Sequence, residues 1–183
     1  MELKDLNGKI VAWAVERKLD KEAKVEAQSV KTCEEFSELV IGLSKDKRDL
    51  IEDSIGDVYV TLVVGNLIGK FIDLDEVYEG AQKDYKKLKT IFSMDGIKSQ
   101  ISYITSCMRN VLNMGYTKHS VTTSLVCLMA LSDLYALPFE KCVESAYKEI
   151  KDRKGRMIKG QFVKESDLND LPRKNLRHRK CSK

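Results

Sequence analysis

Apolar residues recur along most of the chain at steps of three and four positions, the spacing of one face of an α-helix. Few breaks interrupt this pattern, because the sequence contains only two prolines and ten glycines. No long segment alternates at period two, and no internal repeat is evident. The pattern therefore predicts an all-α fold in which only 160–163 is extended, with helices over 6–17, 26–43, 50–68, 74–92, 96–113, 121–135 and 139–154.

The helix predicted over 50–68 is apolar almost all round, which indicates a buried central helix. A chain of 183 residues fits one domain and can bury about two-thirds of the surface that it exposes when unfolded. We expect this domain to cover residues 1–166. Residues 167–183 lack apolar periodicity and are rich in Lys and Arg, so they are predicted to form a disordered basic tail.

The net charge of +4 lies largely in that tail, and the rest of the chain is close to neutral. Nucleic acid is therefore expected as a partner only through the tail, by salt-sensitive phosphate contacts. The five cysteines are scattered and form no CxxC pair, which favours a reducing compartment, the cytoplasm. No membrane partner is expected, because no signal peptide is visible and the most apolar run, 58–68, is too short to span a bilayer.

Acidic residues occupy unusual positions on two consecutive predicted helices. Glu35 and Glu38 share a stripe that borders the apolar face of the first of these helices, and Glu34 flanks it. Asp53 and Asp57 lie one turn apart on the mostly apolar second helix. Carboxylates gathered away from water raise one another's pKa values unless a cation such as magnesium neutralises them. Because a short turn makes the two helices antiparallel, the pattern predicts a metal site between them.

Each half of this arrangement also has a simpler interpretation. Glutamates on an amphipathic helix usually form a solvated face, and Asp53 can stabilise the start of a helix as acids do near N-termini. Asp57 has no such explanation, because it lies well inside an apolar helix. The two motifs at this spacing are therefore more specific together than either is alone.

These residues also resemble a known family. Glu34-Glu35-Phe-Ser-Glu38, followed by Asp53-Ser54-Ile-Gly56-Asp57, is similar to the EExxE…ExxD motifs of MazG-like, all-α nucleotide pyrophosphohydrolases. The resemblance covers about residues 6–69 and 137–166 and is strongest to phage-type members, through positions that include Trp13, Gln28, Lys31 and 146–157.

The chain departs from the family pattern in three places. Ser54 stands where the ExxD motif has glutamate, which leaves Asp53 as the substitute. Lys148 stands where relatives often have asparagine. Residues 70–118 have no counterpart in the short members and look like a helical insertion.

The resemblance implies a nucleoside triphosphate pyrophosphohydrolase that needs magnesium, or manganese in its place, and releases a nucleoside monophosphate and pyrophosphate. It implies a MazG-like helical bundle with direct metal ligands at Glu35, Glu38 and Asp57. Asp53 would be a ligand or a group behind the ligands, and Glu34 a ligand or the base that activates water. The expected phosphate contacts are Lys31, Lys151, Arg153, Lys154 and Arg156, although cations near a helix end are as readily explained by the helix dipole.

The resemblance further implies a homo-oligomer, a dimer or tetramer, because this family usually completes its four-helix bundle between chains. The insertion would then act as a lid or as part of the subunit interface. We favour the interface, because the insertion carries an apolar stripe at Ile97, Ile101, Ile104, Met108, Val111 and Leu112.

Two other functions stay open. The chain can be a catalytically weak binding protein of the same fold, acting through nucleotide, nucleic-acid or protein contacts. It can also be a purely structural helical oligomer. Pyrophosphate release and stabilisation by magnesium plus nucleotide distinguish these alternatives from the enzyme.

Overall fold

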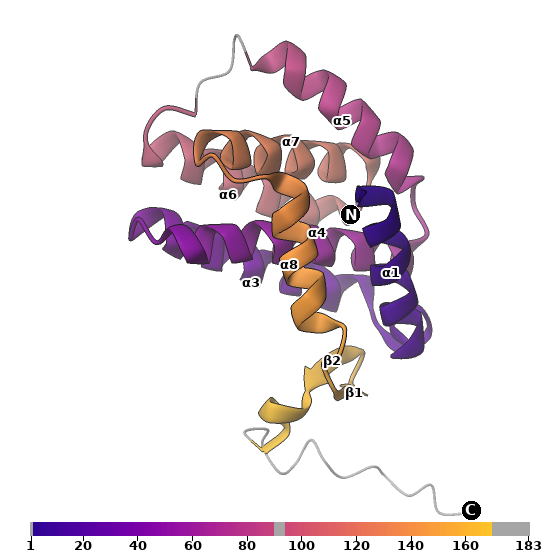
Figure 1. The fold of residues 1–183 in the computed structure, drawn as a ribbon. Helices are drawn as coiled ribbons and strands as arrows, with labels where there is room; N and C mark the ends of the chain where they lie inside the picture. The colour runs from indigo at the N-terminus through magenta and orange to yellow at the C-terminus, as the bar shows by residue number, and fades with distance from the viewer. Residues whose placement is uncertain (1, 90–93, 170–183) are drawn as a thin grey trace, which may run out of the picture.

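The computed structural model describes residues 2–89 and 94–169. Within this part the chain forms eight α-helices, a β-hairpin and a 3-10 turn (Figure 1), so the predicted all-α class is confirmed as a mostly helical fold. The short helix α2 was not predicted. The elements are α1 (Leu3–Glu16), α2 (Leu19–Glu22), α3 (Val25–Ser44), α4 (Arg48–Gly69), α5 (Leu74–Leu88), α6 (Ile97–Met114), α7 (Lys118–Leu134), α8 (Phe139–Ile150), β1 (Gly155–Ile158), β2 (Gln161–Lys164) and η1 (Glu165–Asn169).

The C-terminal part differs most from the prediction. Helix α8 ends at Ile150, four residues earlier than predicted, and the chain continues as the antiparallel strands β1 and β2. Lys159 and Gly160 connect these strands with φ of 53° and 84°, the backbone that a two-residue hairpin turn of matching twist requires. The predicted extended piece at 160–163 is thus one strand of a hairpin.

Four helices form the centre of the domain. Helices α3 and α4 pack along each other, α6 packs on α3, α7 packs on α6, and α4 contacts α7, which closes a four-helix bundle within one chain. Helix α4 is buried along most of its length, as predicted for a central helix. Helix α5 lies on α7 and helix α8 crosses α4, so each covers one side of the bundle (Figure 1).

The apolar stripe of the insertion is largely part of this core. Ile104 and Val111 have no exposed surface and belong to the same hydrophobic cluster as α3, α4 and α7. The expectation that this stripe is free for a subunit interface is therefore wrong at its centre, because α6 packs inside its own chain. Ile97 and Leu112, at its ends, remain exposed.

Two further expectations concern the ends of the described segments. Residues 167–169, predicted to begin the disordered tail, belong to the 3-10 turn η1, and residues 170–183 lie outside the described residues. Helix α5 ends at Leu88, and residues 90–92 of the longer predicted helix also lie outside the described residues. No single helix in 2–89 or 94–169 is long and apolar enough to cross a membrane; α7 and α8 meet that test only as a pair bent by 107°.

Candidate functional site

The helical hairpin of α3 and α4 places the acidic residues. The connection 45–47 is short, so the two helices run antiparallel, and near its open end Gln28 Nε2 donates a hydrogen bond to the backbone oxygen of Thr61 at 3.2 Å. These two constraints fix the register between the helices. The turn that carries Glu35 and Glu38 consequently lies beside the turn that carries Asp53 and Asp57.

Electrostatics show that these carboxylates act on one another. Burial raises the pKa of Asp57 to about 7, and the charges of Glu35 and Asp53 add to this rise, while Arg153 opposes it. Burial also raises the pKa of Asp53, with further contributions from the charges of Glu149, Glu35 and Glu38. The structure therefore collects the predicted carboxylates into one coupled cluster. Glu149, from α8, joins them.

Lys31 partly neutralises the α3 side of this cluster. Its Nζ lies 2.7 Å from Glu35 Oε1 and 3.0 Å from Glu34 Oε2. Burial alone would lower the pKa of Lys31, but the hydrogen bonds and charges of Glu35 and Glu34 outweigh burial and raise it. Glu35 is 7% exposed, so this ion pair lies at the inner edge of the cluster. The carboxylate of Glu35 is thus already engaged in an ion pair with Lys31 in this structure.

The chemistry of the cluster fits a hard divalent cation. Carboxylate oxygens are the ligands that magnesium prefers. The pKa of Asp57 is raised, so the nearby Arg153 does not offset the cost of burying the Asp57 charge. Among the described residues, however, no three acidic, His or Cys side chains converge closely enough to hold one ion. The Lys31–Glu35 ion pair is one physical reason, because it directs Glu35 along its own helix. Metal binding would require Glu35 to turn away from Lys31.

Glu149 of α8 and Arg153, which follows the end of α8, supply two charges to the site from a distant part of the sequence. Arg153, a predicted phosphate contact, lies near Asp57 and Asp53. Arg17 holds the segment that follows α8, because its Nε donates to the backbone oxygen of Arg153 at 3.0 Å and an Nη donates to that of Lys151 at 3.2 Å. The sequence analysis did not assign a role to Arg17 or Glu149. The separation of four residues between Glu149 and Arg153 was the available signal.

A cavity of about 90 Å³ adjoins the acidic cluster. Lys31, Glu35, Asp57 and Arg153 line one part of it, and Trp13 and Phe162 belong to the remaining wall, together with apolar residues of α2, α3 and α4. A charged end and an apolar body are typical of a small-molecule site. The cavity is thus continuous with the predicted site.

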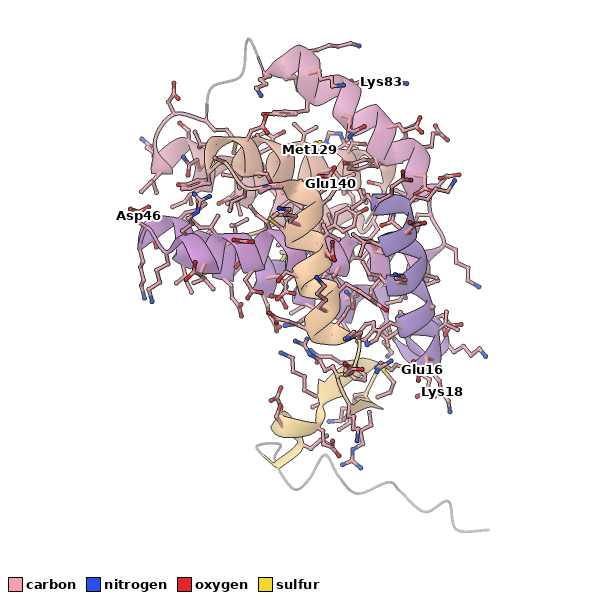
Figure 2. The ribbon with its side chains drawn as sticks, viewed as in Figure 1. Glu16, Lys18, Asp46, Lys83, Met129 and Glu140 are labelled. Carbon is pink, nitrogen blue, oxygen red and sulfur yellow. The ribbon has the colours of Figure 1, made fainter. Side chains whose placement is uncertain are left out.

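The β-hairpin covers this cavity. The backbone oxygen of Gly160 accepts a hydrogen bond from Lys24 N at 3.1 Å, which ties the hairpin turn to the start of α3. The Trp13 and Phe162 rings meet edge to face at 5.9 Å, and Figure 2 shows Glu16 and Lys18 at the end of α1 beside the hairpin. Trp13 Nε1 is buried and finds no hydrogen-bond acceptor among the described residues. Trp13, which lines the cavity, therefore carries a buried donor without a partner in the described part of the chain.

Other predicted site residues lie away from the cavity. Lys151 is exposed and 3.6 Å from Asp152, and Lys154 and Arg156 are exposed. Glu34 and Glu38 are also exposed, at the rim of the cluster. By contrast, Lys164, which was not predicted, lines the cavity from β2. The cavity thus brings together only Lys31 and Arg153 of the five predicted phosphate contacts.

The structure distinguishes the two residues at the altered ExxD motif. Ser54 is 1% exposed, and its hydroxyl has no partner within the described part of the chain. Asp53 is half-buried and senses the charges of Glu35, Glu38 and Glu149. Asp53 therefore belongs electrostatically to the cluster, whereas Ser54 is a buried position.

Comparison with known proteins finds a partial relative. The chain is 38% identical over 78 residues to a protein of Haemophilus phage HP1 described as "Uncharacterized 18.2 kDa protein in rep-hol intergenic region". The match covers 43% of this chain and 46% of the phage protein, so the chain spans about half the length of the curated relative that it matches. No protein-family model and no solved structure matches the chain. The chain is therefore similar to a phage protein over less than half of its own length.

Proposed function

We propose that this protein is a magnesium- or manganese-dependent nucleoside triphosphate pyrophosphohydrolase that cleaves between the α- and β-phosphates. The observation that carries the proposal is the coupled cluster of Glu35, Asp53 and Asp57 at the charged end of a cavity. The resemblance of these same positions to the MazG-like motifs supports the reaction class. Buried, mutually repelling carboxylates are costly to a fold unless a cation or a reaction uses them.

In this proposal Glu35, Glu38, Asp53 and Asp57 hold the divalent ion. When bound, such an ion neutralises the polyphosphate and activates a water molecule. Glu34 is exposed at the edge of the acidic cluster, where Lys31 Nζ donates a hydrogen bond to its Oε2. We keep Glu34 as the candidate base that activates the water molecule. To serve as a ligand, Glu35 would have to give up its ion pair with Lys31, which would leave the Lys31 ammonium paired with Glu34 alone.

Lys31 and Arg153 would contact the phosphates, because both line the cavity together with Glu35 and Asp57. The nucleoside would lie beneath the β-hairpin, where the cavity of about 90 Å³ has to widen to admit it. Trp13 and Phe162 line the cavity there. Arg17 acts as a positioning residue: its hydrogen bonds to the backbone of Lys151 and Arg153 hold this segment, and its guanidinium lies 4.9 Å from the Trp13 ring centre.

The proposal predicts metal-dependent release of pyrophosphate. A panel of ribo- and deoxyribonucleoside triphosphates is incubated with the protein and Mg²⁺, and the products are separated by ion-exchange chromatography. We expect a nucleoside monophosphate and pyrophosphate in equal amounts from at least one substrate, and no product with excess EDTA. Release of single phosphate, or no turnover of any member with Mg²⁺ or Mn²⁺, would contradict the proposed reaction.

A second prediction separates Asp53 from Ser54. We expect Asp53→Asn to lower Mg²⁺-dependent turnover nearly as much as Asp57→Asn. The reason is that Asp53 interacts electrostatically with the other carboxylates, whose charges raise its pKa. Ser54→Ala should leave turnover within about twofold and the free energy of unfolding unchanged or slightly higher, since it removes a buried hydroxyl without a partner. Normal turnover in Asp53→Asn would show that Asp53 has not replaced the missing glutamate.

The alternative of a catalytically weak binding protein rests on the Lys31–Glu35 ion pair, which keeps one ligand occupied. Calorimetry with Mg²⁺ and a nucleoside triphosphate, run beside the product assay, tests it. Heat of binding without product, in both wild type and Asp57→Asn, would favour this alternative over the enzyme.

A further inference from the structure

Helices α3–α5 and α6–α8 have the same plan. In both units the first and second helices are joined by loops of equal length, 45–47 and 115–117. The second and third helices are again joined by loops of equal length, 70–73 and 135–138. Each unit is a helical hairpin followed by one crossing helix. The structure thus reveals a repeat that the sequence pattern did not show.

The contacts between the two units are reciprocal, as they are across an approximate two-fold axis. Helix α8 of the second unit crosses α4 of the first, and helix α5 of the first unit lies on α7 of the second. The two first helices, α3 and α6, contact each other, as do the two second helices, α4 and α7. Reciprocal contacts of this kind define a two-fold interface between identical subunits. Here they occur inside one chain.

The third helices retain a faint sequence correspondence. Aligned at one constant sequence separation, α5 and α8 place alike residues at their buried and exposed positions. The small Ala81 and Ala146 are both fully buried at matching points. The matching pairs are Leu74 and Phe139, Asp75 and Glu140, Val77 and Cys142, Glu79 and Glu144, Ala81 and Ala146, Lys83 and Lys148, and Asp84 and Glu149.

The second unit also has a counterpart of the cavity. A shallow pocket is lined by Tyr103 of α6, by Thr122 of α7, and by Asp84 and Leu88 of α5. At the same constant separation, Asp84 corresponds to Glu149, Leu88 to Arg153, and Thr122 to Asp57. The same surfaces of the two units therefore form both pockets.

The acids themselves have been replaced in this second pocket. The loops 45–47 and 115–117 are further apart in sequence than α5 and α8, so the constant separation does not extend to α3 and α6; the residue that α6 places in the pocket is Tyr103. By the constant separation, Lys118 stands at the position of Asp53. Together with Thr122 at the position of Asp57, these replacements leave no carboxylate on the α6–α7 side of the pocket.

We propose that α6–α8 is a degenerate second copy of α3–α5 that takes the place of a partner subunit, so that one chain forms a complete bundle with one metal site. The single-site half of this inference rests on the proposed function, whereas the duplication rests on the loop lengths, the packing and the α5–α8 correspondence. By this inference, association into a homo-oligomer is not needed to complete the fold.

The duplication is tested by mass and folding together. Sedimentation equilibrium of the full chain, followed from micromolar to nanomolar concentration, should give the mass of one chain, 20.9 kDa, at the lowest concentrations. Circular dichroism at those concentrations should retain the full helical signal. Any dimer at higher concentration should dissociate into folded chains. A dimer that dissociates only as it unfolds would overturn the proposal.

The single site is tested by Mn²⁺ binding, read from the electron paramagnetic resonance of free Mn²⁺. Wild type and Thr122→Ala should bind Mn²⁺ alike, and Asp57→Asn should lose the tight binding entirely. Thr122→Ala is the matched control, because it alters the corresponding position of the second pocket. Tight binding that survives Asp57→Asn but falls in Thr122→Ala would overturn the single site. No binding by wild type would refute the metal-dependent function and the metal site, leaving the duplication to the mass measurement.

Discussion

Asp57→Asn should lower Mg²⁺-dependent turnover by roughly 100-fold or more, because it removes a charged ligand from the centre of the cluster. The same change should stabilise the metal-free protein at alkaline pH. These two effects have opposite signs, which a general disruption of the fold cannot produce. Undiminished turnover in Asp57→Asn would refute the assignment of the site.

The stability effect follows from the raised pKa of Asp57. Its pKa is about 7 in the folded chain and 3.8 ordinarily, so between these values the unfolded state loses the proton first. Stability therefore falls as pH rises from about 4 to about 7, and the loss is complete above pH 7. One pKa unit corresponds to about 1.4 kcal/mol, and with allowance for partial exposure the loss is roughly 2 to 4 kcal/mol.

Urea unfolding with EDTA at pH 4 and pH 8 measures this effect. Asp57→Asn should exceed wild type in free energy of unfolding at pH 8 and equal it at pH 4. Asp133→Asn is a control of opposite sign, because the Lys89 hydrogen bond lowers the pKa of Asp133 and its charged form stabilises the fold. That variant should be no more stable than wild type at pH 8. Equal stability of wild type and Asp57→Asn at pH 8 would contradict the raised pKa.

Gly56→Ala should lower the free energy of unfolding by about 3 kcal/mol and impair the site as well. A Cβ at Gly56 would lie 2.2 Å from the backbone oxygen of Cys142 and 2.8 Å from Ala146 Cβ. Backbone cannot move aside as a flexible side chain does, so α8 must shift away from α4. This shift carries Glu149 and Arg153 away from Asp57, and turnover should fall even where the variant remains folded.

Gly80→Ala is the matched control in the crossing helix of the other unit. A Cβ at Gly80 meets nothing within 4 Å, so the substitution gains helix propensity without a clash. We expect it to raise the free energy of unfolding by about 0.5 to 1 kcal/mol and to leave turnover unchanged. Urea unfolding and the pyrophosphate assay measure both variants. If Gly56→Ala has the same free energy of unfolding as wild type, α4 and α8 are not in such close contact.

The sequence alone determined most of the secondary structure and half of the candidate site. Apolar residues three and four positions apart mark a helix, because neighbours on a helix face are also near in sequence. The helix predicted over 26–43 is accordingly α3, within one residue at each end. The acids of α3 and α4 could be paired in advance because only the short connection 45–47 separates their helices.

Only the tertiary structure decided how distant helices meet. Glu149 and Arg153 reach the cluster because the small residues Gly56 and Ala146 let α8 cross α4 closely, a fit that no local pattern encodes. Ile104 is buried by α3 and α7 instead of facing a partner, although its periodicity is the same in either case. The proposed duplication is not visible as a sequence repeat, because packing constrains only the size and apolar character of a residue. Many different residues meet these two requirements at a given position. Periodicity shows which face of a helix is apolar, whereas long-range packing selects the helix that covers it.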